Sequence, residues 1–332
     1  MTKNNLAISI GLIALLSSAT AQASCGTTAC SINTNWDEHG MSHPGWTADL
    51  RYSYSRADTL RSGSNKITAN PTDMVTYGAG DEVENLRTIN TLVTATADYT
   101  YNDHWGVMLQ LPYVMRDHSH SLADPVTPGY ESFSANALGD IKVVGRYRWA
   151  LDEASRSGMG VKFGLKLNTG KKDFTIAQTG TVPGEVTLQP GNGSTDLILG
   201  LFWNQSTPGS DWNWFAQGTA QSSISSGATF RPGNQINLDG GTRYAFNSNL
   251  SGLLQLNAQW NSSDSGSAAA LSPVTGGASS GGRIFSLSPG LSYAFTPSTQ
   301  LYGLVQLPIY QYVNGEQLTA NSSMTVGISH RF

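Results

Sequence analysis

The feature that most constrains this chain is an alternation of apolar and polar residues with a period of two. It recurs from Gly45 onward, as in residues 87–102, "RTINTLVTATADYTYN". There the apolar set is Ile89, Val93, Ala95, Ala97, Tyr99 and Tyr101, and the polar set is Asn90, Thr94, Thr96, Asp98 and Thr100. Helical spacing cannot produce this pattern, because only a pleated strand turns successive side chains to opposite faces. Each such segment therefore predicts a β-strand with one apolar face.

The alternation predicts about twelve such strands. They begin near residues 46, 87, 105, 139, 159, 196, 212, 236, 250, 283, 299 and 320. Short connections such as 102–104, 247–249 and 296–298 alternate with long ones such as 57–86, 116–138 and 169–195. An even strand number with short turns at one end and long loops at the other is typical of a transmembrane β-barrel. We therefore predict an all-β fold, a transmembrane antiparallel β-barrel over residues 45–332 with short periplasmic turns and long extracellular loops.

The aromatic residues gather at the ends of the predicted strands that face the short turns. They are Trp46, Tyr99, Tyr101, Trp105, Tyr147, Trp149, Trp203, Trp212, Tyr244, Phe246, Tyr293, Phe295 and Phe332. Nearly all of them fall on the outward side of the alternation. A soluble sandwich has no reason to collect outward rings at one edge, whereas a membrane interface does, because amphipathic rings settle at headgroup level.

Composition excludes several other classes of protein. Only 13% of residues are charged and 39% are hydrophobic, so the charge is about half that of a soluble domain of this size. No apolar run after the first 24 residues is long enough for a transmembrane helix. The net charge is −4 and no basic cluster exceeds Lys171 and Lys172, which gives no support for nucleic-acid binding.

The N-terminus has the pattern of an export signal. Lys3 supplies the positive charge, residues 6–16 are apolar, and residues 21–23, "AQA", resemble a cleavage site. We predict a signal peptide over residues 1–23, a periplasmic extension or plug over 24–44, and a location in the outer membrane. Lipidation of Cys25 is disfavoured, because Gln22 does not match the small apolar residues expected there.

Cys25 and Cys30 are the chain's two cysteines. In an exported protein they are expected to pair as a disulfide, and a redox or metal-binding dithiol is the alternative. His39 and His43 have the four-residue spacing of helical metal ligands, but Gly40 disfavours a helix there. An ordered plug or extension is the preferred interpretation of this segment.

Two segments carry a resemblance to a known family. "LGDIKVVGRYRW" (138–149) and the closing "QLPIYQYVNGEQLTANSSMTVGISHRF" (306–332) resemble bacterial outer-membrane barrels labelled as transporters of the MetA-pathway phenol-degradation type. The resemblance implies an outer-membrane channel, while the phenol label says little about the solute. The terminal aromatic Phe332 is the kind of signal that the barrel assembly machinery reads. His330 departs from the aromatic residue expected at that position.

If one face of each strand meets lipid, the other lines the interior. The predicted lumen-lining charges are Arg51, Asp98, Asp140, Lys142, Arg146, Arg148, Lys162, Lys166, Asp239 and Arg243. Five of the basic residues fall on two adjoining strands, 139–149 and 159–166, while the acids other than Asp140 lie on other strands. Such a basic wall would attract anions, because a narrow pore of low dielectric constant focuses the field of its charges. The alternative is a ladder of ion pairs that fills the lumen and passes nothing.

The stretch "MRDHSHSLADP" (115–125) holds His118 and His120 one residue apart. Continued strand parity would turn both toward the barrel mouth, unless Pro112 marks a bulge. They are candidates for a two-histidine metal contact or a pH-sensitive gate, and a plain polar loop is the preferred interpretation. The connection 169–195, with "GKKDF" and several glycines, is expected to be an ordinary solvated loop.

The sequence therefore favours an outer-membrane channel for small solutes, and this channel is expected to prefer anionic or aromatic-acid solutes. No enzymatic site and no cofactor are expected. A metal-handling protein that binds a transition metal through His118, His120, Cys25 and Cys30 is one alternative. A plugged structural barrel that scaffolds a periplasmic or surface partner is another. A catalytic role is disfavoured, because no serine, histidine and carboxylate cluster at one height of the outer face. The sequence does not specify the oligomeric state.

Overall fold

The computed structural model describes residues 44–332 except 71, 73–81, 123, 127–128, 153–156, 178–179, 181–182, 207–208 and 268–278. The predicted signal peptide and almost all of the predicted segment 24–44 lie outside the described residues. The same is true of Cys25, Cys30, His39 and His43, so their predicted roles stay predictions. No helix in the described ranges is long and apolar enough to cross a membrane.

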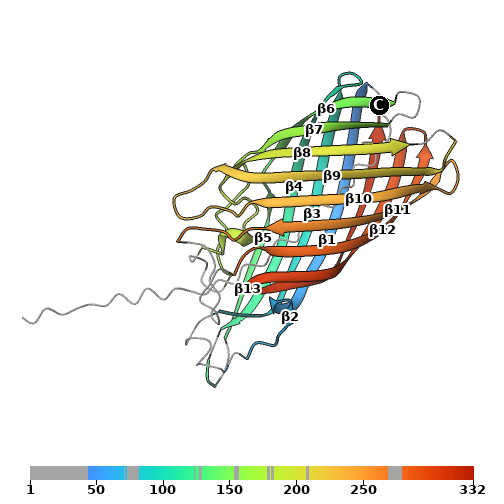
Figure 1. The fold of residues 1–332 in the computed structure, drawn as a ribbon. Coiled ribbons are helices and arrows are strands. Elements are labelled where there is room, and N and C mark those ends of the chain that lie inside the picture. Colours follow the sequence, from blue (N-terminus) through green and yellow to red (C-terminus); the bar gives the residue numbers. More distant parts are fainter. Residues whose placement is uncertain are drawn as a thin grey trace, which may run out of the picture.

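The described chain forms one closed, antiparallel sheet, as predicted (Figure 1). The wall elements are β1 (Gly45–Gly63), β3 (Glu82–Thr100), β4 (Trp105–Leu122), β6 (Lys142–Asp152), β7 (Ser157–Lys166), β8 (Thr195–Ser206), β9 (Trp212–Ser225), β10 (Gln235–Ala245), β11 (Leu250–Asn261), β12 (Gly282–Thr296) and β13 (Thr299–Arg331). Each pairs antiparallel with its neighbours, and β13 pairs with β1 to close the ring. Closure satisfies backbone groups that a sheet edge would leave unpaired in lipid.

The predicted number of strands is confirmed once β13 is divided. Residues Thr299 to Val313 pair with β12, whereas the residues from Glu316 to Arg331 pair with β1. The chain turns between these two runs at Gly315, whose φ of 61° is a conformation that glycine adopts at no steric cost. A ring of antiparallel neighbours needs an even number of passes. The eleven wall elements of the described chain therefore make twelve passes.

Connections of different length gather at the two ends of the barrel. The short-turn end holds the connections at 101–104, 246–249 and 297–298 and both barrel termini, where the Phe332 amide donates to the Trp46 carbonyl at 2.9 Å. The long-loop end holds the connections 167–194, 226–234 and 262–281. In outer-membrane barrels these two ends face the periplasm and the exterior, respectively.

One predicted connection is wrong for most of its length. Instead of a long loop over 116–138, β4 continues to Leu122 and β5 (Gly129–Leu138) returns along it in regular register. Together, β5 and β6 form a single path along β4, interrupted at residues 139–141. The short strand β2 (Asn65–Lys66) likewise extends β1 beyond the wall. Strand pairing continues here because it satisfies the backbone of segments that rise above the membrane.

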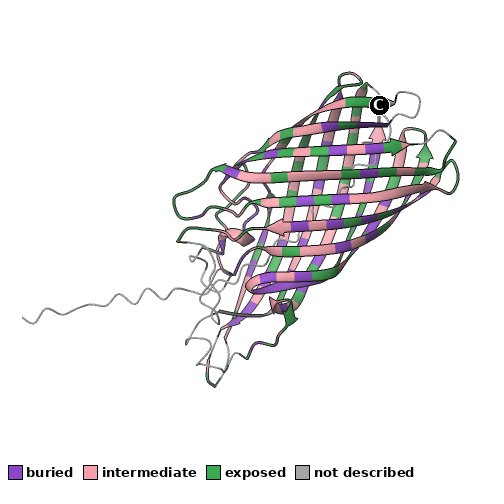
Figure 2. Cartoon of the chain, viewed as in Figure 1, coloured by how far each residue is buried: buried purple, intermediate pink, exposed green. Residues whose placement is uncertain are grey.

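The outer face between the two ends is apolar and exposed, whereas alternate residues are buried or half-buried (Figure 2). Leu50, Leu201 and Leu256 are 52%, 65% and 58% exposed. At the short-turn end the rings form pairs, such as Trp105 with Tyr147 at 4.7 Å between centroids. A soluble protein does not leave a belt of this kind uncovered, and lipid contact explains both the leucines and the aromatic rim.

The interior is largely polar, with two apolar clusters. One is formed by the alternate strands β9, β11 and β13 and contains Phe215, Leu253, Tyr302 and Leu304. The other lies at the long-loop end and contains Ala57, Leu60, Ala69, Phe133, Ala135, Leu188, Leu318 and Ala320. Leu188 belongs to the short 3-10 turn η2 (Val186–Leu188) within the connection 167–194. That connection therefore does not project into solvent as predicted but packs against the barrel wall.

Candidate functional site in the barrel interior

The charges predicted to line the lumen lie on the inner face, and several meet across strands. Arg146 on β6 forms an ion pair with Asp98 on β3, although β4 lies between them. Gly106 on β4 permits this, because a Cβ there would lie 2.5 Å from the guanidinium carbon. Arg146 has the opposite parity to the outward, exposed Val143 and Trp149 of β6, so this pair lies inside.

A second ion cluster surrounds Lys166 on β7. Its Nζ lies 3.0 Å from the Asp140 carboxylate and 3.3 Å from that of Asp196. It also donates to the side chain of Asn192 at 2.5 Å and to Ser194 at 3.0 Å. Asp140 and Asp196 are therefore direct partners of the predicted basic wall, because β7 lies between β6 and β8 and Lys166 pairs in register with Asp196.

Lys142 and Lys162 make hydrogen bonds of a different kind. Lys142 on β6 donates across two strands to the Gln221 amide oxygen at 3.4 Å, and Lys162 on β7 donates to Gln217 at 2.9 Å. Gln217 in turn donates to Asp239 at 2.9 Å. The charge of these two lysines is therefore directed into the interior toward neutral amides of β9.

The remaining predicted lining residues are three arginines, on β10, β6 and β1. Arg243 donates to the Ser251 hydroxyl at 3.1 Å. The Arg148 guanidinium lies against Gly158, where a Cβ would approach it to 2.6 Å. Arg51 on β1 stands between Gly327 and Thr94 in the register of the sheet. Arg148 and Arg243 thus lie toward the short-turn end, whereas Arg51 is close enough to Lys142 for their charges to interact.

The connection 167–194 is tied to the wall by Asp140, which lies in the gap between β5 and β6. The Asp140 carboxylate accepts the backbone N–H groups of Thr169 at 3.1 Å, Gly170 at 2.9 Å and Asn192 at 3.3 Å. It thus binds the beginning and the end of the connection at one point. Gly170 and Gly191 pass so closely that a Cβ on Gly170 would lie 2.7 Å from the Gly191 Cα.

The middle of the same connection reaches farther along the inner wall. Arg116 on β4 donates to the Thr187 carbonyl at 2.8 Å and to the Asn90 side chain at 2.6 Å. A Cβ on Gly184 would clash with the ring of Phe133. The expectation of a solvated loop is therefore wrong, and the glycines of the segment were the signal of this close packing.

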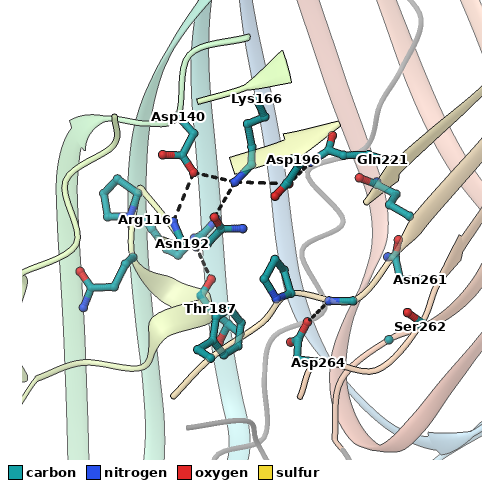
Figure 3. Close-up of a pocket in the computed structure, with 17 residues that line it drawn as sticks. Arg116, Asp140, Lys166, Thr187, Asn192, Asp196, Gln221, Asn261, Ser262 and Asp264 are labelled. Atoms are coloured by element: carbon teal, nitrogen blue, oxygen red, sulfur yellow. Dashed lines mark hydrogen bonds and ion pairs between the residues drawn. The ribbon is translucent and has the colours of Figure 1, made fainter. Parts of the chain in front are cut away.

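A cavity of about 270 Å³ lies between this connection and strands β7–β11 (Figure 3). Figure 3 shows Arg116 and Thr187 on one side and Gln221, Asn261 and Ser262 on the other. Charged, amide and hydroxyl side chains dominate the lining, with Phe230 among the apolar contributors. The sequence analysis did not identify this cavity, since its walls come from segments far apart along the chain.

His118 and His120 face inward at the long-loop end. The strand parity runs through Pro112 without a register shift, since Pro112 pairs opposite Thr94. His118 is 0% exposed; its Nδ1 lies 2.7 Å from the Thr88 hydroxyl and its Nε2 lies 3.1 Å from Nδ1 of His120. His120 Nε2 lies 3.4 Å from the Glu131 carboxylate on β5. The stretch is a buried polar chain in a strand pair, not the plain loop that was preferred.

The environment of these histidines keeps them neutral. They lie above the lipid-facing band, because Asp117, directly before His118, turns outward into an exposed position. Burial, with smaller effects of His120 and Arg116, lowers the pKa of His118 to about 3. Burial also lowers the pKa of His120 to about 4. Each imidazole is therefore uncharged over the physiological range.

The described part of the chain adds no further ligand to the two-histidine metal contact that the sequence suggested. Within the described ranges, no group of three or more His, Cys, Asp or Glu side chains is arranged to hold a metal ion. Cys25 and Cys30 are outside those ranges. Metal binding by His118 and His120 therefore stays a prediction.

Comparison with known proteins places this fold. Residues 62–325 match the family described as "Putative MetA-pathway of phenol degradation". No curated protein matches the sequence. The COG4313 outer membrane channel from Pseudomonas putida F1 is similar, with a TM-score of 0.62 and 14% identity over 89% of this chain and 98% of that chain. The toluene transporter TodX of P. putida is more distant, with a TM-score of 0.45 and 10% identity over 88% and 91%. The chain therefore belongs to the "Putative MetA-pathway of phenol degradation" family, and its fold is that of an outer-membrane β-barrel.

Proposed function

We propose that the protein is an outer-membrane channel for small solutes and that it favours anionic solutes, including aromatic acids. The observation that carries the proposal is the pair Lys142 and Lys162, whose ammonium groups reach into the interior and donate to neutral amides. The similar structure from P. putida F1 is named a channel, and the family description refers to phenol degradation. Both are consistent with passage of small, partly aromatic molecules.

The charge preference follows from the position of these lysines. Arg146 and Lys166 lie against carboxylates, so their fields are largely compensated at short range. Lys142 and Lys162 instead donate to glutamines that in turn donate to carboxylates, Gln221 to Asp196 and Gln217 to Asp239, so an amide stands between each of these hydrogen-bonded cations and acids. In a narrow interior of low dielectric constant, such charges raise the local concentration of anions.

The experiment is the reversal potential of the purified protein in planar bilayers across a KCl gradient. The double variant Lys142→Gln/Lys162→Gln is expected to lose at least about half of the anion-selective reversal potential of the natural protein. Lys171→Gln, which removes an exposed loop lysine paired with Asp173, is the matched control and should leave it unchanged. An unchanged potential in the double variant would refute the proposed role of the lysines.

A plugged barrel that scaffolds a partner is the second candidate, and the inward connection 167–194 favours it. Its Leu188 is only 2% exposed within the apolar cluster at the long-loop end. Conductance separates the two candidates. A correctly folded protein that never conducts in bilayers would support the scaffold and exclude the channel.

A further inference from the structure

The cavity beside the connection 167–194 has a lining that points to a particular ligand chemistry. Three of its side chains are amides that come from different strands: Gln221 on β9, Gln235 on β10 and Asn261 on β11. An amide offers both a donor and an acceptor. Gln235 and Asn261 are direct cross-strand partners, so their inward side chains stand next to each other.

The hydrogen bonds that Gln235 and Asn261 already make are long, whereas Gln221 donates to Asp196 at 2.6 Å. Gln235 donates to Asn237 at 3.4 Å, and Asn261 accepts from Gln259 at 3.5 Å. Hydrogen bonds at this distance are near the outer limit and are readily exchanged for better ones. The adjacent Ser262 hydroxyl can likewise donate and accept. Groups with this dual capacity match ligand hydroxyls, which also donate and accept.

The charges of the lining disfavour a purely ionic ligand. Asp140 and Asp196 surround Lys166 at 3.0 and 3.3 Å, which neutralises the cation at that wall. Two carboxylates around one lysine leave an excess negative charge there, and Arg116 and Asp264 add one charge of each sign to the lining. Burial raises the pKa of Asp264, whose carboxylate accepts the Gly233 N–H at 2.7 Å. No excess of positive charge therefore acts on a ligand inside the cavity.

Apolar surface completes the lining. Phe230 is 6% exposed, and Pro190 and Pro232 also belong to the lining. The C–H faces of a carbohydrate-like molecule pack on such surface while its hydroxyls bind amides. The volume of about 270 Å³ is below the usual range for drug-sized ligands and suits a six-carbon molecule.

We infer that this cavity is a binding site for small polyhydroxylated solutes, held through the amides of Gln221, Gln235 and Asn261. Combined with the anion preference, on which this extension rests, the ligand is a hydroxylated carboxylic acid. Lys142 lies 3.4 Å from Gln221 and marks where the basic interior begins next to the cavity. Hydroxyls are therefore recognised in the cavity, and charge is recognised deeper in the barrel.

The test is ligand-observed NMR titration of the full, detergent-solubilised protein with gluconate and with hexanoate. These probes share a carboxylate and six carbons, and only gluconate carries hydroxyls. Gluconate is expected to bind about tenfold more tightly, since two or more additional hydrogen bonds form. The double variant Gln235→Leu/Asn261→Leu should remove this difference, whereas Gln205→Leu, at an exposed position near the short-turn end, should keep it.

Two results would overturn the inference: equal affinity for both probes, or a gluconate preference that survives in the double variant. Heat-dependent mobility of the barrel on gels checks that each variant is folded. The titration needs no ion flow, so it is independent of the reversal potential. A gluconate preference that the double variant removes, in a barrel without anion selectivity, would uphold the cavity and refute only the proposed charge preference.

Discussion

At the scale of the residue, His118 and His120 show how strand parity and burial together determine the protonation state of a side chain. Parity turns both side chains inward, and β5 covers them from one side with Glu131. Thr88, from β3, lies on the other side of His118. The pair is buried because the strands continue above the membrane, where a loop would have left both histidines in water.

This burial predicts a loss of stability in acid. The pKa values of His118 and His120 in the folded state, about 3 and 4, are below the ordinary value of 6.5. The unfolded chain therefore binds protons first, and stability present above about pH 6.5 is lost as the pH falls toward 4. Burial raises the pKa of the neighbouring Glu131, which opposes part of this loss.

We expect the temperature of the heat-dependent gel shift to fall between pH 7 and pH 4.5 in the natural protein. The decrease should be clearly smaller in His118→Gln/His120→Gln, because that variant has no imidazole to charge at this position. His104→Gln, which changes an exposed histidine at the short-turn end, is the control and should behave as the natural protein does. Identical pH dependence in all three proteins would contradict the assignment.

At the scale of the element, the interruption between β5 and β6 decides where the connection 167–194 lies. Residues 139–141 leave the strand path, and this places the Asp140 carboxylate among three backbone N–H groups of the connection. A carboxylate that accepts several N–H donors holds a segment more firmly than neutral contacts do. The connection is therefore a built part of the inner wall.

Asp140→Ala is expected to loosen this segment. Hydrogen exchange measured by mass spectrometry should become about tenfold faster or more for peptides covering Thr169, Gly170 and Asn192. Asp173→Ala removes a carboxylate that is 73% exposed on the same connection, and its exchange should match that of the natural protein. Unchanged protection in Asp140→Ala would show that the glycine contacts and Leu188 suffice to hold the connection.

At the scale of the whole molecule, ring closure depends on the last strand run. Phe332 ends it and is 78% exposed, with its ring 4.6 Å from that of His330. So exposed a ring contributes little to packing within the barrel. Its place at the terminus fits recognition by the assembly machinery, which is our prediction for this residue.

Phe332→Ala should therefore lower the amount of folded protein in the outer membrane several-fold, while the purified remainder keeps its gel-shift temperature within a few degrees. Phe295→Ala changes another outward ring at the same rim, 57% exposed, and should assemble normally. Quantitative immunoblots of membrane fractions measure both. Equal losses in the two variants would mean that the ring acts through the interface and not through recognition.

The sequence by itself determined which residues form the strands of the barrel wall and which side of each strand faces lipid. Alternation fixes which side chains face lipid, and it does so locally, because a pleated strand assigns faces by position alone. That is why the strand starts, the aromatic rim and the inward direction of Lys142 or His118 could be predicted from single segments. The closing contact of β13 with β1 also follows, since an even number of strands in lipid must close.

Only the tertiary structure decided which side chains and segments meet inside the barrel. The pairing of Arg146 with Asp98 and of Lys166 with Asp140 depends on curvature and on register between strands, which a linear pattern does not contain. The inward course of 167–194 depends on close contacts of Gly170, Gly184 and Gly191 and on the Asp140 carboxylate, which lies on another segment of the chain. The cavity has the same origin. Its residues come from segments more than a hundred positions apart, and local periodicity carries no information about contacts at that range.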